Sequence, residues 1–330
     1  MANEIEKYNA LALSDIEKIN GFADSDIEKL NGFEFTGATL LKGIFFGGYD
    51  AADFSGVTNL VSNSGVIGTD VSAVGTARYD SSAVEFGTGT CIIGFGDSGS
   101  RTGVTNLVST SGVVASDTAA VGLARAGTGA CGYGTGLGLF AYGNISGSPY
   151  YTGVSNKVNS SGVVASDVSG VGTHREYPVG ARYGTDKGIF GLGTNGLAAG
   201  GGHQGITNLV SNSGVIASDT SAVANARYSA CGVEYGTDTA IFDKGAGGSH
   251  VSNLISNSGV VASDTSGVGT DRYSLGACPY GNGKAIEGYG HTGVALQSLS
   301  NLISDSGIVG ADVSGVGTAR QRVSAAAYGT

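Results

Sequence analysis

Short apolar runs separated by glycine, serine, asparagine and aspartate recur along most of the chain. Runs such as TNLVS, GVVAS and CIIGFG are only a few residues long and rich in β-branched side chains. This pattern predicts short β-strands connected by tight turns. The composition agrees, because 60 of the 330 residues are glycine, and each glycine inside a helix costs about 1 kcal/mol relative to alanine. We therefore expect an all-β protein.

The apolar runs belong to a segment that occurs six times, for example as TNLVSTSGVVASDTAAVGLAR. Each copy contains an asparagine, an aspartate eleven residues later, and an arginine eight residues after the aspartate. An aromatic–glycine pair follows eight residues further on, and another glycine comes ten residues after the aromatic residue. The asparagines are Asn59, Asn106, Asn156, Asn208, Asn253 and Asn301; the aspartates are Asp70, Asp117, Asp167, Asp219, Asp264 and Asp312; the arginines are Arg78, Arg125, Arg175, Arg227, Arg272 and Arg320.

Each repeat predicts four short strands, which we call segments A to D. Segment A follows the arginine and ends at the aromatic residue, and segment B is the next apolar run. Segment C holds the asparagine, and segment D ends at the aspartate. Only the stretch between segments B and C changes length, which places a surface loop there. A four-stranded unit that repeats every 45 to 52 residues is typical of a β-propeller blade.

The two ends of the repeat region complete each other. The last copy stops after its segment A, and the missing segment B is found as GIFFGG at residues 43–48. We therefore expect residues 323–328 to pair with residues 43–48 in one composite blade, which leaves no open edge between the first and last blades. Residues 36–330 are predicted to form a six-bladed β-propeller of four-stranded blades, closed by this composite N-/C-terminal blade.

The first 35 residues carry a different repeat, in which NEIEKYNALA, SDIEKINGFA and SDIEKLNGFE follow one another at eleven-residue steps. Ser14 and Ser25 are typical helix N-caps and the following glycines typical helix stops, which predicts a short helical or irregular arm. Such units bury too little apolar surface to fold alone. The recurrence of Ile5, Ile16 and Ile27 favours an arm that anchors the protein to a partner. A mobile tail is the alternative.

The repeats resemble those of the kelch family of β-propellers. The shared features are the arginine before segment A, the glycine after segment B, and the asparagine-to-aspartate segment that leads to the next arginine. The chain departs from that family because it lacks tryptophan and has a Gly-Gly pair after segment B only at residues 47–48. The SDIEKING-like arm and strings such as SGVVASD also resemble structural proteins of tailed bacteriophages. That resemblance implies a virion protein whose arm attaches it to the particle.

The repeated aspartates and arginines are expected to be structural, because a residue present in every blade serves the scaffold. The aspartate would cap the turn after segment D, and the arginine would connect one blade to the next. A calcium site is the alternative, but it needs six or more oxygen ligands, and each repeat supplies one aspartate.

The remaining chemistry-bearing residues form no motif, so we expect no catalytic residue, no cofactor and no metal site. The histidines show no metal-binding spacing, and no serine has the sequence context of a nucleophile. The cysteines are expected to be buried free thiols. The histidines are His174, His203, His250 and His291, and the cysteines are Cys91, Cys131, Cys231 and Cys278.

The variable loops between segments B and C are the candidate binding surface. The two longest carry Tyr150, Tyr151, His203 and Gln204, which are the aromatic and amide side chains that contact glycans or proteins. In an up-and-down blade these loops share one end with the links from segment D to segment A. The arm joins at the opposite end, so we expect it to dock one face to a particle while the loops face outward.

The net charge of −10 argues against nucleic-acid binding, and no apolar run is long enough to span a membrane. We expect a structural virion protein of a tailed phage, assembled in the host bacterial cytoplasm and present in multiple copies on the tail, neck or capsid. Its expected partners are other virion proteins, through residues 1–35, and a host-surface glycan or protein used for host attachment.

Two alternatives are a carbohydrate-active or galactose-oxidase-like enzyme and a generic protein-interaction propeller, since the fold alone does not decide function. An enzyme is not favoured, because enzymatic propellers carry unique acids, histidines or tyrosines that converge on the axis. The repeats of this chain are nearly identical and apolar, so no such convergence is expected.

Overall fold

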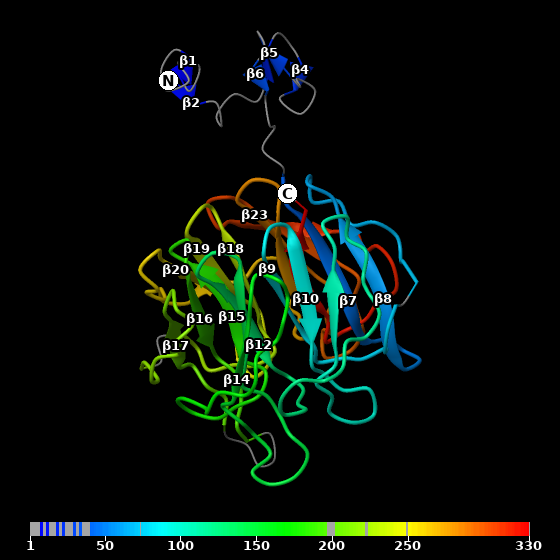
Figure 1. Ribbon diagram of the computed structural model, residues 1–330, viewed down its shortest axis with the longest axis vertical. Coiled ribbons are helices and arrows are strands. Elements are labelled where there is room, and N and C mark those ends of the chain that lie inside the picture. The colour runs from blue at the N-terminus through cyan, green and yellow to red at the C-terminus, as the bar shows by residue number, and fades with distance from the viewer. Residues whose placement is uncertain are drawn as a thin grey trace. The chain divides into compact units, whose positions relative to one another are not determined.

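The computed structural model (Figure 1) describes residues 40–72, 74–196, 202–221, 224–248 and 250–329, together with six two-residue strands nearer the N-terminus. The chain divides into two compact units, one formed by residues 1–40 with Thr330 and the other by residues 41–329. Every regular element in the described residues is a β-strand, which confirms the all-β prediction. The described residues contain no helix long and apolar enough to cross a membrane.

The first unit contains three short β-hairpins where helical turns were predicted, so that prediction was wrong for these residues. The dipeptide Asn-Gly separates the strands of the second and third hairpins, and it favours a two-residue hairpin turn. The hairpins pair β1 (Lys7–Tyr8) with β2 (Leu11–Ala12), β3 (Lys18–Ile19) with β4 (Phe22–Ala23), and β5 (Lys29–Leu30) with β6 (Phe33–Glu34). The predicted caps and anchors Ser14, Ser25, Ile5, Ile16 and Ile27 lie outside the described residues.

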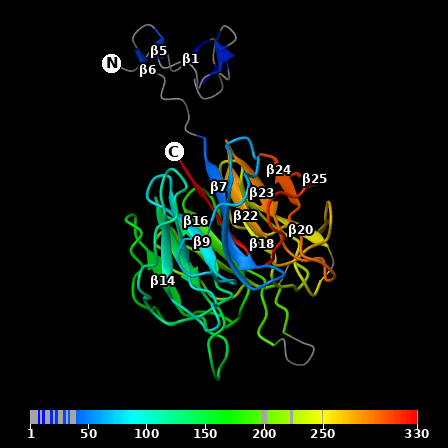
Figure 2. The same ribbon diagram turned by 90° about the vertical axis from the view of Figure 1, so that its right-hand side faces the viewer.

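The second unit consists of six antiparallel sheets of three or four strands, seen from two directions in Figures 1 and 2. Three sheets are β9 (Ser82–Phe86), β10 (Thr90–Gly94) and β11 (Thr105–Val108); β12 (Gly129–Tyr133), β13 (Leu137–Ala141) and β14 (Ser155–Val158); and β15 (Val179–Tyr183), β16 (Lys187–Gly191) and β17 (Thr207–Val210). Two more are β18 (Cys231–Tyr235), β19 (Thr239–Asp243), β20 (Val251–Ile255) and β21 (Thr265–Ser266); and β22 (Gly276–Tyr280), β23 (Lys284–Gly288), β24 (Ser300–Ile303) and β25 (Val309–Val313).

The sixth sheet joins the two ends of the repeat region. β26 (Ser324–Tyr328) pairs antiparallel with β7 (Lys42–Tyr49), which in turn pairs with β8 (Phe54–Val61). In Figure 1 the blue β7 lies beside the red end of the chain. The predicted pairing of residues 323–328 with residues 43–48 is therefore confirmed.

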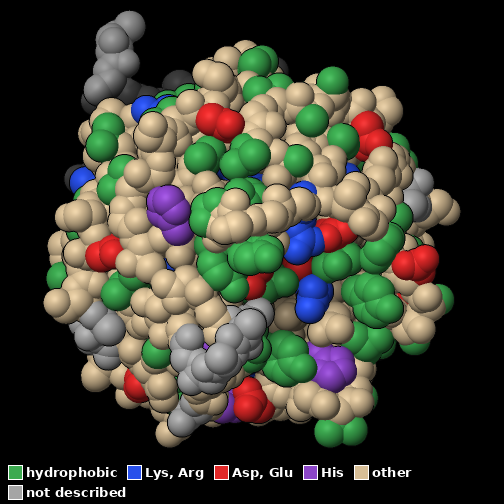
Figure 3. All heavy atoms as spheres, turned by 90° about the horizontal axis from the view of Figure 1, so that it is seen from below, with side chains coloured by type: hydrophobic (Ala, Val, Ile, Leu, Met, Phe, Trp, Pro, Cys, Tyr) green, Lys and Arg blue, Asp and Glu red, His purple; other side chains and the backbone are tan. Residues whose placement is uncertain are grey.

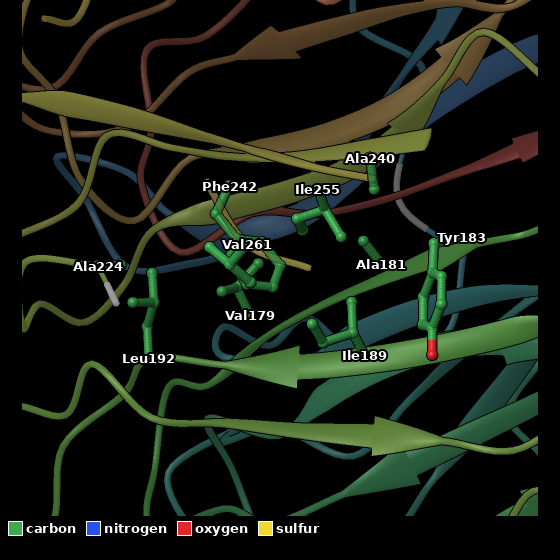
Figure 4. Packing of buried hydrophobic residues seen from close by; sticks show 10 residues of the cluster. All are labelled: Val179, Ala181, Tyr183, Ile189, Leu192, Ala224, Ala240, Phe242, Ile255 and Val261. Atoms are coloured by element: carbon green, nitrogen blue, oxygen red, sulfur yellow. The ribbon is translucent and has the colours of Figure 1, made fainter. Parts of the chain in front are cut away.

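The first strands of the six sheets are neighbours in a fixed order. β9 contacts β12, β12 contacts β15, β15 contacts β18, and β18 contacts β22. β26 contacts β22 on one side and β9 on the other. Much of the packing between sheets is apolar, as in the cluster of Figure 4, where Val179 and Ile189 of one sheet meet Phe242 and Ile255 of the next.

Within the described residues a regular fourth strand forms in only two sheets, as β21, which begins just after the aspartate that ends segment D, and as β25, whereas the sequence predicted four strands in every blade. In the sheet of β11, segment D is joined by isolated bridges such as that between Val108 and Val114. The side-chain amide of Asn106 donates to the carbonyl oxygen of Ala115 at 3.0 Å. The same asparagine bond forms in all six repeats, including those with β21 and β25, so this side chain reinforces the pairing of segment D without deciding whether a fourth strand forms.

Candidate functional site

The repeated arginines, asparagines and aspartates form a hydrogen-bond network in every repeat. Arg125 donates from Nε to the carbonyl oxygen of Tyr142 at 2.9 Å and from Nη2 to Oδ1 of Asn156 at 2.7 Å. Asn156 donates to Oδ1 of Asp167 at 2.8 Å, and this carboxylate accepts the backbone N–H of Leu123 at 3.0 Å. All six repeats contain the same arginine–asparagine–aspartate bonds.

The charges of this network stabilise the scaffold, since each one is held by fixed partners. The guanidinium of Arg125 is fully buried and lies 4.0 Å from the centre of the Phe95 ring, which belongs to the preceding sheet. Burial lowers the pKa of Arg125 to about 10, so it stays charged at neutral pH. Burial alone would raise the pKa of Asp312, but hydrogen bonds from Thr270 and Asn301 outweigh it and lower that pKa to about 2.

The four cysteines are buried free thiols. Burial raises the pKa of the Cys131 and Cys278 thiols well above the ordinary value, so they stay protonated and pack as small apolar groups. The described parts of the chain contain no group of three or more His, Cys, Asp or Glu side chains arranged to hold a metal ion.

The residues two positions after the six arginines surround one end of a central cavity. All six have a positive φ, between 51° and 60°. Backbone N–H groups connect successive sheets here: Arg322 donates to Ser274 at 2.6 Å, and Gly127 donates to Asp80 at 2.9 Å. We call this end of the cavity the mouth, and its six residues are Asp80, Gly127, Tyr177, Ser229, Ser274 and Arg322.

Three of these residues form a polar cluster. The carboxylate of Asp80 accepts hydrogen bonds from the Tyr177 hydroxyl at 2.8 Å and from Nη1 of Arg322 at 2.9 Å. The guanidinium of Arg322 lies 5.1 Å from the ring centre of Tyr79 and 5.9 Å from that of Tyr177. A Cβ at Gly127 would lie 3.0 Å from the Tyr177 ring, so a glycine at this position gives the tyrosine room to reach Asp80.

Aromatic side chains surround the cluster on the same face. The rings of His203 and Tyr228 stack with their centroids 4.8 Å apart, and Tyr228 lies 6.2 Å from Tyr177. The hydroxyl of Tyr273 lies 3.0 Å from Nδ1 of His291. Figure 3 looks onto this face, where acidic and basic side chains meet near the centre between hydrophobic ones.

Glu176 adds a buried carboxylate beside the cluster. Its side chain is 5% exposed and makes no hydrogen bond to any group in the described part of the chain. Burial, and after it the charge of Asp80, raise the pKa of Glu176 to about 7, while Arg101 and Arg322 oppose the shift. A carboxyl group without a partner in such a place is available to a ligand.

The cavity beneath the mouth has a volume of about 140 Å³. Pockets that enclose small molecules usually measure about 300–1,000 Å³, whereas one water occupies about 30 Å³ of liquid volume. The cavity therefore has room for a few waters, and a larger ligand has to lie on the mouth. The second residue of each of the six first strands is small and lines this cavity. These residues are Ala83, Ala130, Gly180, Gly232, Ala277 and Ala325.

The opposite end of the first strands opens into a second cavity of about 240 Å³, lined by Arg182, Glu234 and Leu41. Leu41 is the first residue of the second unit, so the chain enters this unit at the end away from the mouth. Bridges such as Tyr79 to Asp97 hold the loops between segments B and C beside the links that precede segment A. Within the second unit, this confirms the prediction that the loops between segments B and C share one end of the sheets with the links from segment D to segment A.

The four predicted loop residues have different surroundings. Tyr150 is 59% exposed, and Tyr151 forms a β-bridge with Asn144. The side-chain amide of Gln204 donates to Asn195 and is already engaged within its own loop. Only His203 of the four belongs to the aromatic group described above.

Sequence reasoning missed the polar cluster at the mouth, and its expectation that no unique acids, histidines or tyrosines converge on the axis was wrong. The signal was present at the two positions after each repeated arginine, which differ between the copies, as do the residues of segment A that follow them. These pairs are Tyr79–Asp80, Ala126–Gly127, Glu176–Tyr177, Tyr228–Ser229, Tyr273–Ser274 and Gln321–Arg322.

No protein-family model matches the chain, and no curated protein matches it. The assignment of the mouth as the candidate site rests on its geometry.

Proposed function

We propose that the chain is a structural protein of a tailed-phage particle that displays a binding surface on a six-bladed β-propeller. The six sheets, the neighbouring first strands and the pairing of β26 with β7 support a ring closed by a composite blade. The repeats of residues 1–35 support an arm that anchors the propeller to other virion proteins, in multiple copies per particle. The exposed mouth then serves host attachment, by contacting a glycan or protein of the host surface.

The observation that carries the binding function is the gathering of non-repeated residues at one mouth of a repeated scaffold. Six copies of one sequence need only one set of side chains to build six sheets. The residues at the mouth depart from that set and include Asp80, Glu176, Tyr177 and Arg322. Half-buried tyrosines and arginines with some polar groups unsatisfied are typical of binding surfaces.

The test is adsorption of particles that carry a changed mouth. Replacing Tyr228 with alanine removes one ring of the aromatic group beside the mouth, and we expect adsorption to host cells to fall at least tenfold. Val294→Ala is the matched control, because Val294 is 93% exposed in a loop that starts on the same face. Normal adsorption of Tyr228→Ala particles that contain the protein in normal amount contradicts the proposal.

One observation favours a second candidate function, a glycoside hydrolase. Glu176, with a pKa raised to about 7, lies near Asp80, whose pKa burial also raises although it is ion-paired with Arg322, and a pair of carboxyl groups supplies the general acid and the base or nucleophile of such enzymes. This candidate predicts that the protein cleaves aryl glycosides and that Glu176→Gln abolishes cleavage. Binding without cleavage supports the display function instead.

A further inference from the structure

The flat aromatic surface at the mouth is the first feature that defines the chemistry of its ligand. The rings of His203 and Tyr228 lie at 28° to each other and form a stacked pair. Both side chains are half-buried, so part of this pair is open to solvent. A Cβ at Gly247 would lie 2.6 Å from the His203 ring, so this glycine leaves space for the histidine. Such a surface suits a ligand with a flat apolar face.

Two unsatisfied polar groups adjoin this surface. Nδ1 of His203 is buried and has no hydrogen-bond partner among the described residues, and the carboxylate of Glu176 has none either. The backbone bridges that join Glu176 to Thr194 and Thr194 to His203 place both residues on the same face, with Thr194 between them. Buried polar groups normally have partners, and a hydroxyl can both donate and accept. A ligand hydroxyl could bond to Glu176, whereas Nδ1 of His203 has no surface that a ligand on the mouth would reach.

The charges of the mouth exclude a strongly ionic ligand. Arg322 is paired with Asp80, and Arg101 is paired with Asp97, so neither guanidinium is free to bind an anion. An acidic ligand would also meet the carboxylate of Glu176, which has no cation bonded to it. An amine would lie near both guanidinium groups. The ligand that these charges favour is therefore neutral.

We propose that the mouth binds the face of a neutral pyranose ring at the exposed end of a glycan. This inference rests on the proposed function and names the ligand class of the same site. The ring lies against the solvent-exposed part of the Tyr228–His203 pair, and its hydroxyls bond to Glu176. The cavity below is too small for the sugar, so it stays hydrated and the sugar covers it.

Calorimetric titration of the full-length protein with methyl glycosides of glucose, galactose and mannose tests the inference. Galacturonic acid and galactosamine are the charged comparators. We expect at least one neutral sugar to bind, with both charged sugars at least tenfold weaker. Failure of all three neutral glycosides to bind overturns the inference, and so does a charged sugar that binds as tightly as the best neutral one.

Variants at and beside the mouth provide the second part of the test. Tyr228→Ala should weaken binding of the neutral sugar at least tenfold, Tyr228→Phe should retain it because the ring remains, and Val294→Ala should leave it unchanged. Circular dichroism melting of each variant reports whether the fold is intact. Equal binding by Tyr228→Ala and the parent protein contradicts the stacking role.

The sugar titrations and the adsorption assay separate this inference from the proposed function. If mouth variants lose adsorption while no neutral sugar binds or competes, the attachment function stands and the ligand is a protein. If a neutral sugar binds at the mouth while adsorption is unaffected, the ligand class stands and the attachment function fails.

Discussion

Replacing Lys244 with methionine tests how neighbouring sheets are held together. Lys244 and Glu287 are fully buried, and Nζ of Lys244 donates to Oε1 of Glu287, which joins the end of β19 to β23. Lys244 also pairs with Asp243 at 3.1 Å, and Arg272 lies 3.9 Å from Glu287. With all four side chains ionised, two negative charges balance two positive ones, although burial raises the pKa of Glu287 to about 7.

Three other sheet interfaces have two aromatic rings at the positions that Lys244 and Glu287 occupy. Each pair packs edge to face, with ring centroids between 5.1 and 5.5 Å apart. The ion pair therefore replaces one aromatic contact of the repeat. The aromatic pairs are Phe95 with Phe140, Tyr142 with Phe190, and Tyr289 with Phe45.

Lys244→Met should lower the free energy of unfolding by about 3–5 kcal/mol, because it leaves buried carboxylates without their cation. That loss is a large part of the ~5–15 kcal/mol that stabilises a typical domain. At about 2 °C per kcal/mol for a chain of this length, Tm should fall by about 6–10 °C. The triple variant Asp243→Ala, Lys244→Tyr, Glu287→Phe restores an aromatic pair, which contributes about 0.5–1.5 kcal/mol, and should recover most of the loss.

Urea denaturation at pH 7, followed by circular dichroism, measures both differences. The reasoning is wrong if Lys244→Met lies within about 1 kcal/mol of the parent protein. It is also wrong if the triple variant is as unstable as Lys244→Met, because the cost would then not come from unpaired buried charge.

Three further predictions concern the thiols, the composite sheet and acid. Titration with a thiol reagent should find no reactive cysteine in the native protein and four after denaturation without reductant. Finding only two thiols in the denatured protein would indicate a disulfide. Deleting residues 321–330 removes β26 and should give insoluble protein, whereas a soluble, cooperatively melting product would show that the sheet does not need this strand. The pKa values of Asp70, Asp117, Asp219 and Asp312 are lowered in the fold, because hydrogen bonds outweigh burial. The contribution of these carboxylates to the free energy of unfolding is complete above their unfolded pKa near 4 and is lost as the pH falls toward 2. Tm should therefore drop across that range, and an unchanged Tm would contradict the stabilising role of the network.

The scaffold was predictable because its determinants recur at fixed spacing in the sequence. The asparagine, aspartate and arginine positions define the strand boundaries, and the incomplete last copy identified the partner of β7. The mouth was not predictable in this way, because its residues meet only when several sheets come together. Asp80 and Arg322 are separated by 242 residues in sequence, and no local pattern connects them.

The errors in the prediction have local causes. In the arm, Asn-Gly was taken as a helix stop, although the same dipeptide favours a hairpin. In segment D, a short run of apolar and β-branched residues between turn residues indicated a full strand, whereas in most sheets the structure joins this segment by isolated bridges.

The pairing of β7 with β26 sets a time during synthesis at which the second unit can be completed. Ser324 bonds to the backbone of Phe46, 278 residues earlier in the chain. At about 5–20 residues per second on the ribosome, β7 has to wait about 14–56 s for its partner. During that interval the nascent chain exposes an unpaired strand edge, which is a site for pairing with another chain. Neighbouring nascent copies of this sequence are the nearest competitors, because each one carries the same edge.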